Sequence, residues 1–171
     1  MKNPDNVNSA VSERFERIMK ACVYLCEKGI YPRDSYYTNP PATEEEIAEL
    51  ESRTNQKLPD HYTDFLRISN GFKFVHFEIY GTRDFGKNDG IVPDDFITIG
   101  KSSDGAQRLA VSPTGVYLCY IYPYPSPDGT FVKQPTLFRT EMHKLMTTLE
   151  EEAEKQRQKE KNESGRHFGR R

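Results

Sequence analysis

The chain of 171 residues contains no tryptophan, only three cysteines and almost no net charge. An odd count of three cysteines does not supply the disulfide framework of a small secreted fold. No apolar run approaches the length of about 18 residues that a membrane-spanning helix needs. The first ten residues, MKNPDNVNSA, also lack the apolar centre of a signal peptide. These absences predict a cytoplasmic protein with no membrane segment.

Charged residues are abundant but balanced. They make up 29% of the chain against 35% hydrophobic residues, and the net charge is −2 at pH 7. Proteins that bind nucleic acids without sequence preference need a concentrated basic surface for the phosphates. The composition therefore argues against nucleic acid as a partner. The length is sufficient for one hydrophobic core with polar extensions around it.

The clearest local pattern is a pair of amphipathic helices between residues 42 and 72. Thr43 stands three residues before Glu46, which is the spacing of a capping box at a helix N-terminus. Pro59 suits the first position of a second helix, because its fixed φ and missing N–H donor are tolerated there. Asn70 and Gly71 are residues that tolerate a left-handed cap and are expected to close that second helix.

Periodicity predicts the remaining elements and an α+β fold. We expect a mainly antiparallel sheet of four to six strands, packed with N-terminal and C-terminal helices. Residues 1–41 are expected to form a helix and a Pro/Tyr-rich linker packed on the domain, 42–150 the domain itself, and 151–171 a charged tail that frays. The expected helices cover residues 9–28, 43–55, 59–69 and 140–150, and the expected strands 72–80, 96–99, 108–111, 116–121 and 134–138.

Residue types that carry catalysis are present but not grouped. Cys22 and Cys26 fall on the apolar face of the first helix and Cys119 in an apolar strand, where free cysteine packs as a small hydrophobe. The four histidines show no metal-binding spacing. The segment 81–88, GTRDFGKN, approaches a phosphate-binding loop, but Asn88 replaces the required Ser or Thr. We therefore predict no enzyme activity, no cofactor and no metal.

Acidic residues from strands and loops are the candidate binding residues. They are expected to share one rim of the sheet and to complement a basic partner such as a nuclease, because complementary charge speeds association and sets specificity. The alternative is that the aspartates only form turns. Two tyrosines join this set of candidate binding residues, because tyrosine is enriched at binding hot spots. The alternative is that they pack within the domain or the linker. The predicted partner contacts are Glu78, Asp84, Asp89, Asp94, Asp95, Asp104, Tyr122 and Tyr124.

Two consecutive motifs resemble a known superfamily. The pattern E-I-x-x-L-E-x-R at residues 46–53, followed by L-P-x-x-Y-x-x-F-L-x-x-S-N-G at 58–71, is similar to the SUKH superfamily. The stretch 96–104, FITIGKSSD, resembles its central strand and turn. The resemblance covers about residues 43–150.

This resemblance implies a function. It suggests a non-catalytic bacterial immunity protein that binds a cognate polymorphic toxin and neutralises it by covering the toxin's active site, with no cofactor. A nuclease or another nucleic-acid-modifying enzyme is the expected kind of toxin. The second interpretation is a regulatory interaction scaffold, because the superfamily also includes fungal members that are linked to cell-wall regulation. The toxin's identity and the oligomeric state stay open.

Overall fold

The computed structural model describes residues 9–84, 92–122 and 128–168, and it has the predicted α+β fold. The helices are α1 (Ser9–Glu27), α2 (Glu44–Thr54), α3 (Asp60–Leu66) and α4 (Phe138–Phe168). The strands are β1 (Tyr37–Thr38), β2 (Phe72–Phe74), β3 (Phe77–Ile79), β4 (Ile97–Ser102), β5 (Gln107–Ser112), β6 (Gly115–Tyr122) and β7 (Thr130–Thr136).

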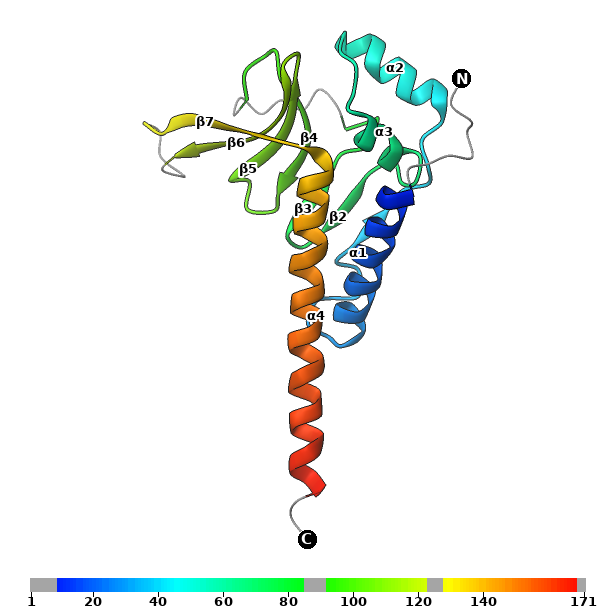
Figure 1. Cartoon of the computed structure of the whole chain (residues 1–171), viewed down its shortest axis with the longest axis vertical. Coiled ribbons are helices and arrows are strands. Elements are labelled where there is room, and N and C mark those ends of the chain that lie inside the picture. The colour runs from blue at the N-terminus through cyan, green and yellow to red at the C-terminus, as the bar shows by residue number, and fades with distance from the viewer. Residues whose placement is uncertain (1–8, 85–91, 123–127, 169–171) are drawn as a thin grey trace.

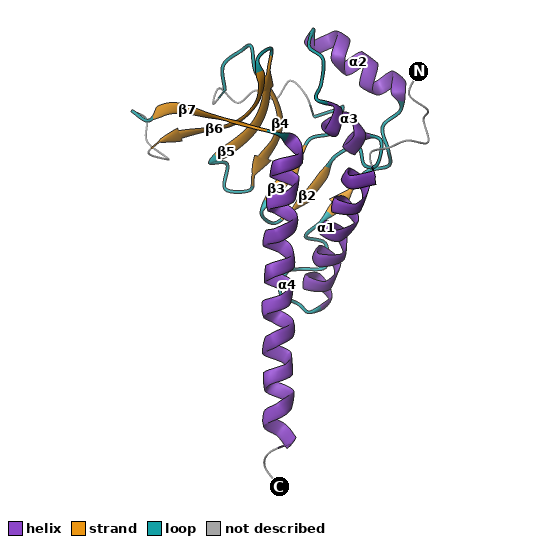
Figure 2. Ribbon diagram, viewed as in Figure 1, coloured by secondary structure: helices purple, strands orange, loops and turns teal. Residues whose placement is uncertain are grey.

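The strands form one sheet in which every strand pairs with its neighbour in the chain (Figure 2). All six pairings are antiparallel. The predicted count of four to six strands is wrong, because the described residues contain seven. One added strand is the two-residue β1, which lies in the proline- and tyrosine-rich linker. The other arises because the single strand expected over 72–80 is a hairpin, β2–β3.

Burial explains why residues 72–80 turn back. Side chains of a strand alternate between the two faces, so Phe72 and Ile79, seven positions apart, would face opposite sides of one continuous strand. In the structure Phe72 pairs with Ile79 and Phe74 with Phe77 across the hairpin. Phe72 and Ile79 are both buried in the main core. The turn thus places the apolar residues of both strands on one face of the sheet.

The helices cover that face and form the main core (Figure 1). Phe15 of α1 packs edge-on against Phe65 of α3 at 5.3 Å between ring centroids and against Phe72 of β2 at 5.6 Å. The other face carries a smaller cluster of Val92, Phe96, Ala110 and Cys119. This two-sided packing confirms that a sheet packs with N-terminal and C-terminal helices.

The second helix of the signature segment is shorter than expected. The helix α3 ends at Leu66, with Arg67 as its C-cap, rather than at residue 69. Asn70 is therefore not a helix cap. Gly71 has a φ of +105°, a left-handed conformation that glycine adopts without a Cβ penalty. Residues 67–71 therefore form the connection between α3 and β2.

The helix α4 is the longest element. It begins at Phe138, two residues before the expected start, and runs for 31 residues. Figure 1 shows it extending well past the end of α1. Its surface is charged, and none of the described helices is long and apolar enough to cross a membrane. The proposed boundary at residue 150 falls inside this helix, and the division of the chain into three parts stays a prediction.

Candidate partner-binding surface

The signature segment that carries the family resemblance is used for folding. Glu46 completes the capping box with Thr43 by accepting from its backbone N–H at 3.0 Å. Glu51 accepts from the backbone N–H of Leu58 at 2.9 Å. Arg53 donates to the backbone carbonyl of Thr82 at 3.0 Å. Each polar side chain of the first motif therefore holds a loop or a helix end in place.

Asn70 joins two further segments. Its side-chain oxygen accepts from the Thr82 backbone N–H at 2.6 Å, and its amide donates to the Thr82 hydroxyl at 2.9 Å. Its backbone carbonyl accepts from the Asn39 amide at 2.8 Å. Ser69 donates to the carbonyl of Gly71 at 2.7 Å. The motif S-N-G thus ties the linker before α2 to the loop that follows β3.

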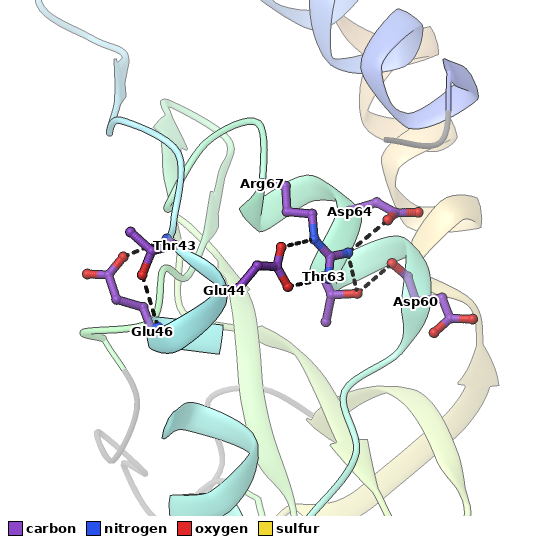
Figure 3. A network of polar contacts seen from close by, with 7 residues as sticks. All are labelled: Thr43, Glu44, Glu46, Asp60, Thr63, Asp64 and Arg67. Carbon is purple, nitrogen blue, oxygen red and sulfur yellow. Dashed lines mark hydrogen bonds and ion pairs between the residues drawn. The ribbon is translucent and has the colours of Figure 1, made fainter. Parts of the chain in front are cut away.

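A second polar network holds α2 against α3 (Figure 3). Arg67 donates to both carboxylate oxygens of Glu44, at 2.6 and 3.0 Å, and to Asp64 at 3.1 Å. The hydrogen bond from Arg67 lowers the pKa of Glu44. Thr63 donates to the backbone carbonyl of Asp60 at 2.9 Å. Bidentate arginine pairs of this kind fix geometry more than they add stability at an exposed site.

A cleft of about 450 Å³ lies where these segments meet. Arg83 reaches across to Glu46 at 3.5 Å, with 88% of its side chain exposed. Asp84 turns back and accepts from the Gly81 backbone N–H at 3.1 Å. The lining residues are Tyr37, Asn39, Pro40, Pro41, Glu46, Asn70, Arg83 and Asp84.

One of the predicted contact residues, Asp84, lines this cleft, and a second, Glu78, interacts with the cleft residue Tyr37. Burial raises the pKa of Tyr37, and the nearby carboxylates Glu78 and Asp84 add to the effect. Glu78 also lies 3.6 Å from the Lys101 ammonium, with only 16% of its side chain exposed. Glu78 and Asp84 are therefore close to the same tyrosine, and both interact with groups of the chain itself.

The other predicted contact acids that the structure describes lie at the two ends of β4. Asp94 and Asp95 are exposed just before β4, and the Asp95 carbonyl accepts from Gln56. Asp104 follows β4 at its other end. A strand of six residues is about 20 Å long, so Asp104 is separated from Asp94 and Asp95 by about that length. The expected single acidic rim is therefore absent among the described residues, because β4 separates its members.

Asp104 acts as a turn residue. Its carboxylate accepts from the Ser102 hydroxyl at 2.5 Å and from the Ala106 backbone N–H at 3.0 Å. These hydrogen bonds lower its pKa. Asp89 and Tyr124 lie outside the described residues, and of Tyr122 only the backbone at the end of β6 is described. The role of all eight predicted residues in binding stays a prediction.

The register also brings together residues that the sequence analysis missed. Directly opposed residues share one face of a sheet, and one continuous row crosses all seven strands on the face opposite the main core. Its members are Tyr37, Lys73, Glu78, Lys101, Arg108, Cys119 and Lys133. Four of these seven residues are basic and one is acidic. Alternation within each strand identifies the face, but the alignment between strands is a tertiary property.

Groups able to act as nucleophiles or metal ligands are buried or dispersed. Burial raises the pKa of Cys22 to about 12 and that of Cys119 to about 11, and burial also raises the pKa of Cys26. Such thiols remain protonated and unreactive at neutral pH. The described part of the chain holds no group of three or more metal-ligating side chains.

The fold and the signature segment together define an α+β domain, and the comparison with known families identifies it. Residues 41–159 match the SMI1 / KNR4 family (SUKH-1). The match covers more than half of the chain, so this protein belongs to that family, as the two motifs predicted. A comparison with curated proteins found no match.

Proposed function

We propose that this protein is a non-catalytic immunity protein that binds a cognate toxin and neutralises it by covering the toxin's active site. The observation that carries the proposal is its membership of the SUKH-1 family over residues 41–159. The toxin is a protein, such as a nuclease or another nucleic-acid-modifying enzyme. Binding takes place in the cytoplasm of a bacterial cell and requires no cofactor.

Two structural features support a binding role. The polar residues of the signature motifs are engaged in holding the chain together, for example Arg53 on Thr82 and Asn70 on Thr82. The described thiols are buried and have raised pKa values. A steric mechanism fits these features, because blocking an active site needs a rigid complementary surface and no reacting group.

The test is capture of the partner from native cells, followed by co-expression. We expect one partner in stoichiometric amount that stays bound at high salt. Its toxic domain should kill cells when expressed alone and spare them when this chain is present. As the control, a catalytically inactive form of the same domain should bind this chain and kill neither culture. Killing that persists despite a formed complex would contradict the proposal.

The second candidate function is a regulatory interaction scaffold. The observation that favours it is α4, which continues past α1 and presents a charged surface away from the sheet (Figure 1). A scaffold should bring down several partners in less than stoichiometric amounts, and none of them should be toxic. That outcome of the capture experiment would favour the scaffold over the immunity role.

A further inference from the structure

We propose that the face of the sheet opposite the main core binds an acidic protein surface through three lysines, Lys73, Lys101 and Lys133, called here the lysine row. The inference deepens the proposed function, because it names the charge of the partner surface that the chain covers. An acidic partner surface is opposite in charge to the basic partner that the acidic residues of the sequence suggest.

The register places the lysine row in one line across the sheet. Lys73 on β2 opposes Glu78, and Glu78 opposes Lys101 on β4. The register then continues through Arg108 on β5 and Cys119 on β6, which are buried, to Lys133 on β7. Neighbouring strands lie about 4.8 Å apart. The first gap, two strands wide, is therefore about 10 Å, and the second, three strands wide, is about 14 Å. These spacings suit carboxylates distributed over a folded surface.

The ammonium groups at the two ends of the row are available to a partner. Lys73 and Lys133 are exposed, and neither forms an ion pair within the described residues. Lys101 is 38% exposed, and its pair with Glu78 is long at 3.6 Å. A partner carboxylate can approach the two end lysines without first breaking an ion pair. This arrangement lowers the desolvation cost of binding.

Aromatic rings hold two of the lysines in place. The Lys133 ammonium lies 4.9 Å from the Tyr117 ring centroid and 5.5 Å from that of Phe96. The Lys101 ammonium lies 5.9 Å from the Tyr80 ring centroid. Cation–π contacts of this kind restrict the rotamers of a lysine, so less side-chain entropy is lost when a partner binds. The lysine row is therefore partly ordered before a partner arrives.

An acidic protein fits this surface better than a nucleic acid does. Single-stranded nucleic acids bind by stacking bases on exposed aromatic faces beside a dense basic groove. Here Lys133 covers the faces of Tyr117 and Phe96, and Phe96 is itself buried. The three lysines are widely spaced on a chain of net charge −2. Phosphate binding draws on many close cations, whereas a few spaced cations suffice for a protein interface.

The test uses a chemical probe and does not depend on the toxin. Fluorescent peptides of ten glutamates and RNAs of ten uridines are titrated into the whole chain at low salt, with fluorescence anisotropy as the readout. The lysine-row variant is K73Q/K101Q/K133Q. Glutamine avoids placing a second carboxylate beside Glu78.

The control variant is K20Q/K144Q/K155Q. It removes the same charge from exposed lysines of α1 and α4, outside the sheet. Circular dichroism and the thermal midpoint of each variant show whether it is folded. Sedimentation of the wild-type chain tests whether a second copy occupies the face.

We expect the glutamate peptide to bind the wild-type chain, the lysine-row variant to weaken that binding at least tenfold, and the control variant to change it less than twofold. Equal weakening by both variants, absence of peptide binding, tighter binding of the RNA, or a dimer that the lysine-row variant dissolves would each overturn the proposal. If the lysine-row variant is unfolded, the single variants K73Q and K133Q replace it with the same criterion.

The co-expression assay separates this inference from the proposed function. A wild-type chain that fails to protect cells contradicts the immunity role and leaves the peptide result standing. A wild-type chain that protects, together with a lysine-row variant that protects equally well, contradicts the inference alone. Charge reversal of Asp84, Asp94 and Asp104 in the same assay tests the acidic residues. Loss of protection there, with the lysine-row variant still active, would assign binding to the acids.

Discussion

At the scale of single residues, Gly81 packs closely against Asn70 of the S-N-G motif and leaves no room for a side chain. A Cβ added at this position would lie 2.3 Å from the carbonyl oxygen of Asn70 and 2.6 Å from its side-chain oxygen. The Asn70 carbonyl oxygen accepts from the Asn39 amide and the Asn70 side-chain oxygen accepts from the Thr82 backbone N–H, so neither atom can move aside cheaply. Asn70 and Asp84 both line the cleft.

We expect Gly81→Ala to lower the free energy of unfolding by about 3 kcal/mol, the upper part of the range for overpacking a fitted site. Urea unfolding followed by circular dichroism measures it. The matched control is Gly165→Ala, because a Cβ at Gly165 in α4 meets nothing within 4 Å. That change should leave stability the same or raise it slightly, since alanine favours a helix. Equal effects of the two changes would contradict the steric argument.

The three thiols should be unreactive toward thiol reagents in the folded protein. Because burial raises the pKa of Cys22 to about 12 and that of Cys119 to about 11, we expect almost no reaction with a thiol reagent at about pH 8. In denaturant all three should react. Rapid labelling of one thiol in the native state would contradict the burial shown here and reopen an enzymatic role for that cysteine.

At the scale of elements, the capping box determines where α2 begins. The Thr43 hydroxyl accepts from the Glu46 backbone N–H at 3.2 Å, and the Glu46 carboxylate accepts in return from Thr43 at 3.0 Å. We expect Thr43→Ala to lower the free energy of unfolding by about 1 kcal/mol. Thr43→Ser keeps the hydroxyl and should cost much less. A serine variant as unstable as the alanine variant would show that the methyl group matters instead of the cap.

The contact between α1 and α4 should make a pH-dependent contribution to the stability of the fold. Arg17 donates two hydrogen bonds of 2.7 Å to Glu150, and these lower the pKa of Glu150 below its ordinary value of 4.5. A carboxyl whose folded pKa is depressed stabilises the fold above its unfolded pKa and loses that contribution as the pH falls through the folded value.

We therefore expect Arg17→Gln to reduce the thermal midpoint slightly at about pH 7, because the pair is exposed and screened. The difference from wild type should shrink as the pH falls below 4.5. Thermal unfolding over a pH series measures it. Lys20→Gln is the comparison variant, since Lys20 pairs with Glu16 within α1 and lowers its pKa, so the change removes an ion pair that does not join two helices. A difference that grows on acidification would contradict the assignment.

At the scale of the whole molecule, α4 joins the sheet to the N-terminal helix. Beyond residue 150, Ala153 is buried at 1% exposure. Arg157 lies 4.4 Å from the centroid of the Tyr24 ring, and Glu160 pairs with Lys28 at 3.0 Å. Tyr31 donates to Glu152 at 2.5 Å. The first part of the expected tail therefore contributes packing between the two ends of the chain.

We expect truncation after residue 150 to lower the free energy of unfolding by about 2 kcal/mol, from the lost apolar burial and hydrogen bonds. Truncation after residue 162 keeps all the contacts named above and should change stability little. Denaturant unfolding of both shortened chains is the measurement. Equal stability of the shorter chain and the full chain would place the end of the domain at residue 150, as the sequence suggests.

The sequence by itself determined the fold class, the family and the start of α2, because these depend on local patterns. Thr43 and Glu46 cap a helix wherever it packs, and the spacing of apolar residues follows from helix and strand geometry. The sequence also predicted Glu78 and Asp84 as partner contacts, which stays a prediction, and only the structure brings both close to Tyr37.

Only the tertiary structure decided the hairpin at residues 72–79, the separation of Asp94 from Asp104, and the alignment of the lysine row. The hairpin and the lysine row depend on which residues of different strands lie opposite one another, whereas the separation of Asp94 from Asp104 depends on the length of β4. That register results from burying Phe72 and Ile79 on the same face, and a shift by one residue would move every side chain of a strand to the other face. Register is the collective outcome of packing a whole core, which no short stretch of sequence encodes.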